Sequence, residues 1–214
     1  WIDEWKLEGP DMNSLSVQAA SPDFAFDMDL LATGPLVFHG ENGFSQKSAE
    51  GQASYYYSQP FYKISGTLNL PEGDIPVTGS AWLDREWSSQ PLSDDQKGWD
   101  WFSLSFEDGE KMMGFQLRQS DGSYYTSATW IDVNGETQSY PDGAFMAEPL
   151  EETRVAGRDV PIRWRVRLPD RNLDAEVLAL MPKAWMDVSI PYWEGPVGIS
   201  GSHFGRGYLE MTGY

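Results

Sequence analysis

Three consecutive charged residues, Asp84, Arg85 and Glu86, lie in a segment flanked by tryptophans, where their types and spacing suit acid–base chemistry. If this segment is extended, alternation puts Asp84 and Glu86 on the same face as Trp82. Arg85 and Trp87 then point to the opposite face. Contact with aromatic walls raises the pKa of a carboxyl group by desolvation, as a general acid at neutral pH requires. The segment therefore predicts an acidic and aromatic site.

Charges inside a strand have a second explanation, because burying a charge is costly unless the charge is paired. Under this interpretation Arg85 and Asp100, or Arg118, form a structural ion-pair network that closes one end of a barrel. Structural networks perturb pKa values as readily as catalytic sites do. The residues alone leave the catalytic and the structural interpretations open.

Strict alternation of apolar and polar residues indicates the elements that must position these side chains. Every second residue is apolar over 24–30, which predicts a half-buried strand. The same alternation over 162–168 and 173–179, on either side of a Pro-Asp-Arg-Asn turn, predicts a hairpin. Amphipathic helix periodicity is scarce, so we expect an all-β fold.

Three turn dipeptides recur at a spacing of 13 residues: Asp108-Gly109, Asp121-Gly122 and Asn134-Gly135. Such dipeptides supply the positive φ angles of tight hairpin turns, so they predict a meander of consecutive antiparallel strands. Closing a meander into an up-and-down barrel removes its exposed edges. With roughly eight strands, the interior is either filled by side chains or wide enough for one small apolar ligand.

A domain boundary is predicted at residues 88–98, which are polar, include Pro91 and lack any period. About five or six strand candidates precede this segment, and about eight follow it. The second part has enough strands for a complete barrel, whereas the first part has too few.

The composition excludes several classes of protein. The chain has 214 residues and a net charge of −18, which repels phosphate backbones and anionic lipid headgroups. We therefore expect no nucleic-acid partner. The absence of cysteine and the wide separation of the two histidines predict no metal site and no cofactor. No apolar run approaches the roughly 18–20 residues of a membrane span, so no integral membrane segment is expected.

Six sequence blocks together resemble the AttH and carotenoid 1,2-hydratase family of lipocalin-like proteins, which includes proteins described as secreted hydrolases. The blocks are Tyr55-Tyr56-Tyr57-Ser58, GSAWLDREWSS (79–89), GWDWFSLSF (98–106), KMMGFQLR (111–118), Tyr192-Trp193-Glu194-Gly195 and GYLEMTGY (207–214). The resemblance covers nearly the whole chain and implies two lipocalin-like (calycin) β-barrels in tandem. Residues 1–90 would be the C-terminal part of a first barrel, incomplete in this chain, and residues 98–214 a second barrel.

The resemblance also implies an activity and a ligand. For a hydratase, Asp84 would protonate an isolated alkene, and Glu86 or Arg85 would orient the attacking water. Aromatic faces would stabilise the intermediate cation. The implied partner is an apolar small molecule, either an isoprenoid or an acyl lipid. The implied substrate-binding residues are Trp82, Trp87, Trp99, Trp101 and Tyr56.

Two other functions remain as alternatives, namely a non-catalytic lipid carrier or chaperone and a secreted esterase. An esterase would need His203 as the base for Ser200 or Ser202, in a segment that lacks the G-x-S-x-G spacing. The family resemblance implies a periplasmic or secreted protein. An incomplete first barrel leaves strand edges exposed, so we expect pairing with a second copy or with a missing N-terminal segment.

Overall fold

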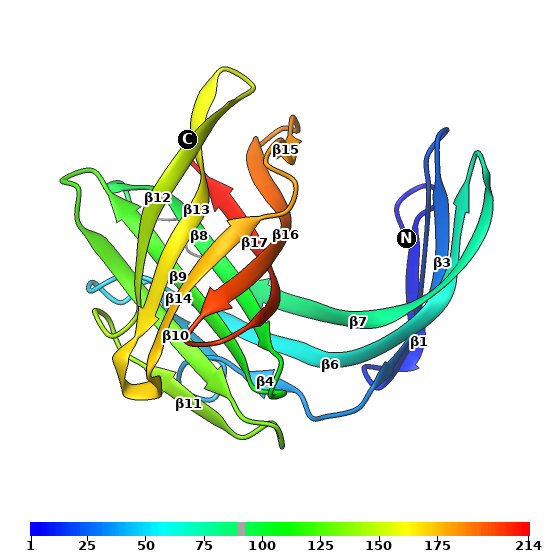
Figure 1. Cartoon of the computed structure of the whole chain (residues 1–214). Coiled ribbons are helices and arrows are strands. Elements are labelled where there is room, and N and C mark those ends of the chain that lie inside the picture. Colours follow the sequence, from blue (N-terminus) through cyan, green and yellow to red (C-terminus); the bar gives the residue numbers. More distant parts are fainter. Residues whose placement is uncertain (90–92) are drawn as a thin grey trace. The chain divides into compact units, whose positions relative to one another are not determined.

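The chain folds almost entirely into β-strands, which form two antiparallel sheets (Figure 1). The computed structural model describes residues 1–89 and 93–214. Within these residues one short 3-10 helix, η1 (Pro169–Arg171), interrupts the strands. None of the described helical segments has the length and apolar character needed to cross a membrane. The predicted all-β, antiparallel fold class is confirmed.

The first sheet contains seven strands in the order β1-β2-β3-β6-β4, with β5 and β7 also paired to β6. Two of these strands, β6 and β7, are much longer than the others. The strands are β1 (Lys6–Asp11), β2 (Ser14–Ala20), β3 (Ala25–Ala32), β4 (Val37–Phe38), β5 (Phe44–Gln46), β6 (Ala53–Leu70) and β7 (Gly73–Trp87).

The second sheet contains ten strands in the order β11-β10-β9-β8-β17-β16-β14-β13-β12, with β15 also paired to β16. The strands are β8 (Gln96–Phe106), β9 (Lys111–Gln119), β10 (Tyr124–Ile131), β11 (Thr137–Tyr140), β12 (Met146–Val155), β13 (Arg158–Leu168), β14 (Leu173–Ala179), β15 (Trp185–Met186), β16 (Tyr192–Gly201) and β17 (Gly205–Thr212).

The chain divides into two compact units. Unit 1 contains Trp1–Val37 and Tyr57–Arg85, and unit 2 contains Phe38–Tyr56 and Glu86–Tyr214. Strands β6 and β7 therefore contribute residues to both units. Residues 90–92 of the predicted boundary, including Pro91, lie outside the described residues. The division into barrels at residues 90 and 98 stays a prediction.

Unit 1 has a small apolar core on one face of its sheet. Met28 and Leu30 of β3 are buried, whereas Asp27 and Asp29, which alternate with them, are exposed. This confirms the predicted half-buried strand from residue 25 onwards, and Phe24 precedes β3 and is exposed. Tyr62 of β6 completes the buried set, and its hydroxyl donates a 2.6 Å hydrogen bond to the carbonyl of Met12. The partly buried residues that pack against this core are Leu15, Val17, Phe26, Ala32, Ile64, Leu68, Val77, Ala81 and Leu83.

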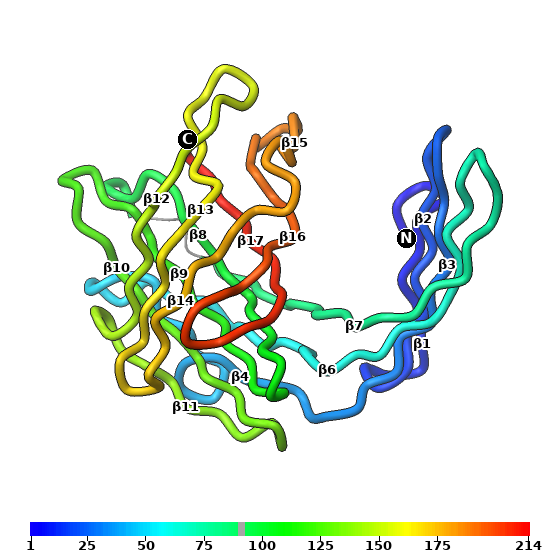
Figure 2. The backbone as a smooth tube through the Cα atoms, in the orientation of Figure 1, coloured from blue at the N-terminus to red at the C-terminus, as the bar shows by residue number. Residues whose placement is uncertain are grey.

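Unit 2 contains a meander whose first and last strands pair with each other (Figure 2). β17 lies between β8 and β16, with Gly205 opposite Phe106 and Met211 opposite Asp100. The hydrogen-bonded order starts at β11 and ends at β12. Side chains also join β11 to the turn between β13 and β14. Arg171 of η1 donates from Nε to the Tyr140 hydroxyl and from Nη2 to Gln138, each at 2.6 Å.

The turns predicted from the sequence are present in unit 2. The glycines of the three dipeptides have φ angles of 97°, 87° and 86°, and they lie between β8 and β9, β9 and β10, and β10 and β11. Residues 162–168 and 173–179 pair as the antiparallel strands β13 and β14 across η1. The meander and the hairpin are therefore confirmed.

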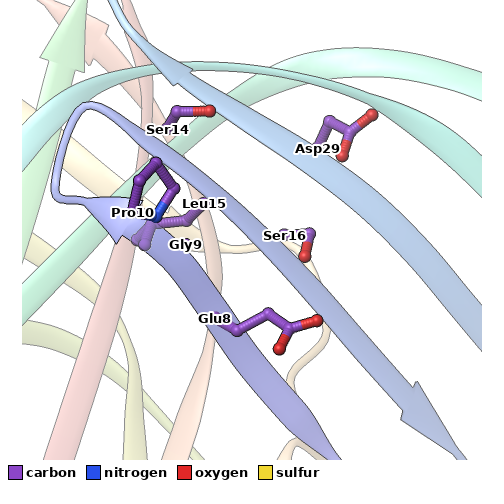
Figure 3. Close-up of a pocket in the computed structure, with 7 residues that line it drawn as sticks. All are labelled: Glu8, Gly9, Pro10, Ser14, Leu15, Ser16 and Asp29. Atoms are coloured by element: carbon purple, nitrogen blue, oxygen red, sulfur yellow. The ribbon is translucent and has the colours of Figure 1, made fainter.

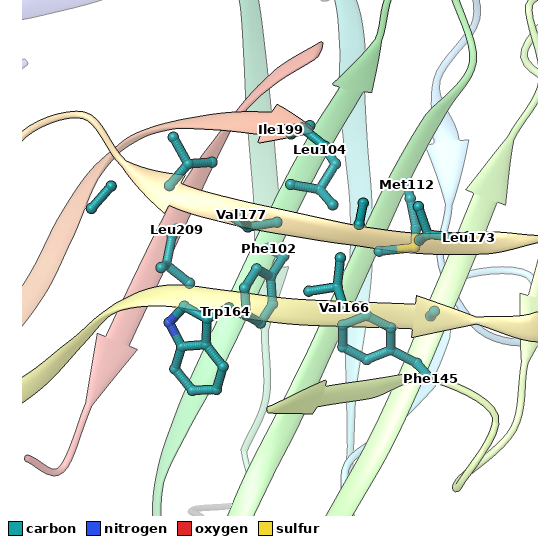
Figure 4. Packing of buried hydrophobic residues seen from close by; sticks show 14 of the residues in the cluster. Phe102, Leu104, Met112, Phe145, Trp164, Val166, Leu173, Val177, Ile199 and Leu209 are labelled. Atoms are coloured by element: carbon teal, nitrogen blue, oxygen red, sulfur yellow. The ribbon is translucent and has the colours of Figure 1, made fainter. Parts of the chain in front are cut away.

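The interior of unit 2 is packed with large apolar side chains (Figure 4). Phe102 of β8 meets the rings of Phe145 and Trp164 edge-on, with centroids 5.9 and 5.6 Å apart. Trp164 and Trp193 are almost completely inaccessible. Of the two alternatives for a barrel of this size, the interior of unit 2 corresponds to the one filled by side chains.

Candidate functional site

The Asp84 carboxylate is held by hydrogen bonds within unit 1. Asp84 is half-buried on β7, and its Oδ1 accepts a 2.7 Å hydrogen bond from the indole Nε1 of Trp82. The Ser58 hydroxyl on β6 donates to the same oxygen. Leu83, between the tryptophan and the aspartate, packs instead against the core of unit 1. The result is an oriented carboxylate in contact with an indole.

Glu86 belongs to a different cluster, in unit 2. Its Oε1 lies 2.7 Å from Nζ of Lys47 and accepts a 2.5 Å hydrogen bond from the Ser54 hydroxyl. Lys47 is largely buried, with Nζ 4.1 Å from the ring centroid of Phe115 and 5.1 Å from that of Tyr56. The lysine charge is therefore stabilised both by a carboxylate and by aromatic faces.

Tyr56 connects this cluster to β8. The Tyr56 ring is buried, and its hydroxyl accepts a 2.9 Å hydrogen bond from Nε1 of Trp101. His39 lies against the ring, with centroids 4.2 Å apart. Burial, together with the charge of Lys47, lowers the pKa of His39 to about 3, so this imidazole is neutral at pH 7.

The remaining residues of the DREW block are exposed. The Trp87 side chain is 53% exposed and stacks on Tyr55, with ring centroids 6.0 Å apart. Arg85 is also exposed. The predicted site residues are thus divided between the two units. Unit 1 contains Trp82, Asp84 and, as its last residue, Arg85. Unit 2 contains Tyr56, Glu86, Trp87, Trp99 and Trp101.

A buried ion pair on β8 and β9 of the second sheet matches part of the structural alternative. Asp100 is completely buried and pairs with Arg118, as that interpretation allows. Gln116 Nε2 and the Tyr214 hydroxyl each donate to this carboxylate at 2.8 Å. Burial raises the pKa of Asp100, while Arg118 and the two donors oppose the rise. Arg118 also donates to the carbonyl of Thr212, so the network joins β8, β9 and β17.

Two glutamates of the recognised blocks lie beside Trp99 and Trp101. Nε1 of Trp99 donates a 2.7 Å hydrogen bond to Glu210, and Glu194 stands directly opposite Glu210 in the pairing of β16 with β17. Burial raises the pKa of Glu194, and a hydrogen bond from Tyr192 opposes the rise. In the structure both are half-buried, between neighbours that face the core of unit 2.

Ser202 and His203 form a hydrogen-bonded pair in the turn before β17. Ser202 Oγ lies 2.9 Å from Nδ1 of His203, and it also accepts a hydrogen bond from the backbone N–H of Asp174. The imidazole packs on Phe106 and Trp130. Among the described residues no carboxylate hydrogen-bonds to His203, so the third member of an esterase triad is not supplied here.

An open pocket lies on the strands β1 to β3 of unit 1 (Figure 3). Ser16 of β2 stands between Glu8 of β1 and Asp29 of β3 in the strand register. A polar lining of this kind suits an apolar ligand poorly. Within residues 1–89 and 93–214, no group of three histidine or acidic side chains is arranged to hold a metal ion.

Several residues of these clusters were not identified from the sequence. Ser58, Ser54 and Lys47 hold the two carboxylates of the DREW block, and His39 packs beside Tyr56. Serines within strand patterns carry no distinctive signal. Lys47 lies between strands, where no periodicity points to a partner.

Comparison with known proteins places these residues in a family. The model of the AttH-like family matches residues 1–214. A crystal structure of a protein described as an AttH from Nitrosomonas europaea is 36% identical, with a TM-score of 0.91, and the match covers 99% of this chain and 68% of that chain. No curated protein sequence matches.

A more distant structural likeness is to the kievitone hydratase of Nectria haematococca. The identity is 18% and the TM-score is 0.83, and the match covers 99% of this chain and 69% of that chain. At this identity the likeness establishes a shared fold.

Proposed function

Because the chain belongs to the AttH-like family, we propose that it is a hydratase-type enzyme that adds water to a carbon–carbon double bond of an apolar molecule. The fold shared with a hydratase is compatible with this reaction class. An isoprenoid or acyl lipid is the proposed ligand. We also propose a periplasmic or secreted location, and association with a second copy or with an additional segment of chain.

The observation that carries the proposal is the environment of Asp84. Its Oδ1 takes hydrogen bonds from Trp82 and Ser58, so the carboxyl group is fixed in orientation beside an indole. A general acid must be both oriented and close to an apolar reactant. The two hydrogen bonds that orient Asp84 and its half-buried position beside an indole support this role.

The reaction uses Asp84 as the proton donor. The protonated carboxyl group gives its proton to one alkene carbon, and a tertiary carbocation forms at the other carbon. A water molecule attacks the cation, and the proton that this water loses restores the carboxylic acid. The indole of Trp82, which is hydrogen-bonded to this carboxyl group, supplies a negative ring face for the cation.

The aromatic residues of unit 2 also fit a simpler role, as a surface that binds an apolar ligand. Trp99 and Trp101 are held by hydrogen bonds, and Tyr56 is buried behind Trp101. Because the interior of unit 2 is filled, we place the ligand on these aromatic surfaces instead of inside that sheet. A lipid carrier would need these aromatic surfaces but would not need Asp84 as a proton donor.

Replacement of Asp84 separates the enzyme from the carrier. We would measure binding and alcohol formation for β-farnesene with wild-type protein, Asp84→Asn and, as a matched control, the exposed Asp23→Asn in the same unit. The enzyme proposal expects lost turnover with retained affinity in Asp84→Asn and an unchanged control. Unchanged turnover in Asp84→Asn would refute the role of Asp84. Binding without turnover by the wild-type protein would support the carrier.

A further inference from the structure

A row of three side chains crosses the outer face of β16, β17 and β8. Glu194 pairs with Glu210 in the register of β16 and β17, and Glu210 pairs with Trp101 in the register of β17 and β8. Trp193 and Leu209, which precede the two glutamates, are buried in the core of unit 2. Alternation therefore puts Glu194 and Glu210 on the side of the sheet away from the packed interior.

Hydrogen bonds within the protein fix Trp101 and the neighbouring Trp99 in place. Trp99, two residues before Trp101 on the same strand, donates its indole N–H to Glu210 at 2.7 Å. Trp101 donates its own indole N–H to the Tyr56 hydroxyl at 2.9 Å. Both indole N–H groups are thus satisfied within the protein. The rings offer apolar surface to a ligand without a further cost in side-chain ordering.

The close approach of Glu194 and Glu210 disfavours a negative charge on both residues at once. Side chains directly opposite in an antiparallel pair have Cβ atoms about 4.5–5.5 Å apart, and like charges there destabilise the sheet. Burial raises the pKa of Glu194, while the hydrogen bond from Tyr192 opposes the rise. Burial, together with Glu194, also raises the pKa of Tyr208, so that its phenol stays neutral. A proton shared between the two carboxyl groups would relieve this repulsion, and Trp99 already donates a hydrogen bond to Glu210.

We propose that the Glu194–Glu210–Trp101 row binds the hydroxyl group of an otherwise apolar ligand, such as a tertiary isoprenoid alcohol. This inference rests on the proposed function for the apolar part of the ligand. An alcohol both donates and accepts a hydrogen bond. The neighbouring carboxyl groups of Glu194 and Glu210 hydrogen-bond to the hydroxyl, and the indoles of Trp99 and Trp101 pack against the hydrocarbon.

Such a row distinguishes an alcohol from the alkene that differs from it by one water. A hydrogen bond to a charged group strengthens binding by roughly 10-fold to 100-fold. Sites built around a hydroxyl reject analogues that lack it, because the polar groups of the site are then left unpaired. The row would therefore hold the product of a hydration more tightly than its substrate.

The test uses nerolidol and β-farnesene as probes, since nerolidol is a tertiary alcohol equivalent to farnesene plus water. Dissociation constants would be measured by calorimetry for wild-type protein, Glu210→Gln and Glu194→Gln. Glu152→Gln, an exposed carboxylate on β12 of the same unit, is the matched control. We expect wild type to bind nerolidol at least about 10-fold more tightly than β-farnesene. We also expect Glu210→Gln to lose most of this preference, with β-farnesene affinity and the control unchanged.

The outcomes separate this inference from the proposed function. Equal wild-type affinity for the two probes, or equal weakening of both by Glu210→Gln, overturns the hydroxyl site and leaves the apolar ligand in place. Absence of binding by both probes counts against the apolar ligand itself, and with it against both proposals. If Glu210→Gln unfolds, as judged by circular dichroism, Glu194→Gln provides the same comparison through the other carboxyl group.

Discussion

The hydroxyl of Tyr214 provides a direct measure of the buried ion pair in unit 2. It donates a 2.8 Å hydrogen bond to Asp100, which is completely buried, and the ring lies over the Arg118 guanidinium at 4.1 Å. The substitution Tyr214→Phe removes the hydroxyl and keeps the ring on the arginine. It therefore tests the hydrogen bond alone.

The expected loss in the free energy of unfolding depends on the hydrogen bonds that Asp100 keeps in the Tyr214→Phe protein. Gln116 and Arg118 still donate to Asp100, so the carboxylate stays paired and only one charged hydrogen bond is lost. Such a bond contributes about 1.5–3 kcal/mol to the free energy of unfolding. For a chain of this size the melting temperature should fall by roughly 3 to 12 °C. Asp100→Asn should cost more, about 3–5 kcal/mol, because it leaves Arg118 without its counter-charge.

The assay is urea unfolding followed by tryptophan fluorescence, combined with hydrogen exchange of the β8, β9 and β17 amides in unit 2. Tyr55→Phe is the matched control, since the Tyr55 side chain is 57% exposed and its change should stay within about 0.5 kcal/mol. A Tyr214→Phe protein as stable as the control would refute the reasoning. So would an Asp100→Asn protein that loses less stability than Tyr214→Phe.

Two further changes test the surroundings of Tyr56. Lys47→Met removes the partner of Glu86 and the cation beside two rings, so urea unfolding should show a loss of about 1–2 kcal/mol, with exposed Lys183→Met as an unaffected control. Equal stability of both variants would contradict this. For His39, burial holds the folded pKa at about 3 against an ordinary 6.5, so the unfolded chain binds the extra proton between these values. Its stabilising contribution is complete above pH 6.5 and is lost as the pH falls towards 3. The stability difference between wild type and His39→Phe should therefore change across this window, and a constant difference would show that His39 does not titrate as described.

The sequence predicted those parts of the fold in which local pattern and tertiary structure agree. The β13–β14 hairpin follows from alternation around a turn, and the three glycine turns follow from the need for positive φ. Segment 38–56 could not be assigned in this way. Its strands β4 and β5 are two and three residues long, and its place in unit 2 depends on contacts such as Lys47 with Phe115.

The sequence singled out candidate site residues by type but did not predict how the structure groups them. The sequence singled out Asp84 and Glu86 together, and alternation gave both the same face, yet their partners are Ser58 and Lys47 in different clusters. The structural alternative offered two arginines for Asp100, and Arg118 is the one that pairs with it. Such pairs depend on how strands distant in the sequence align with one another, and the sequence of a single strand does not contain this information.

The position of β17 between β8 and β16 has a consequence for folding during synthesis. β8 and its partner β17 are separated by about 100 residues, so the edge of β8 that β17 covers stays unpaired until about 100 further residues have emerged. At 5–20 residues per second this interval lasts roughly 5–20 s. Throughout it, an aromatic strand with an open hydrogen-bonding edge is available to other chains. Contacts of such long sequence separation also close slowly. Pairing of β8 with β17 is therefore a step at which an exposed strand edge favours aggregation until β17 has been made.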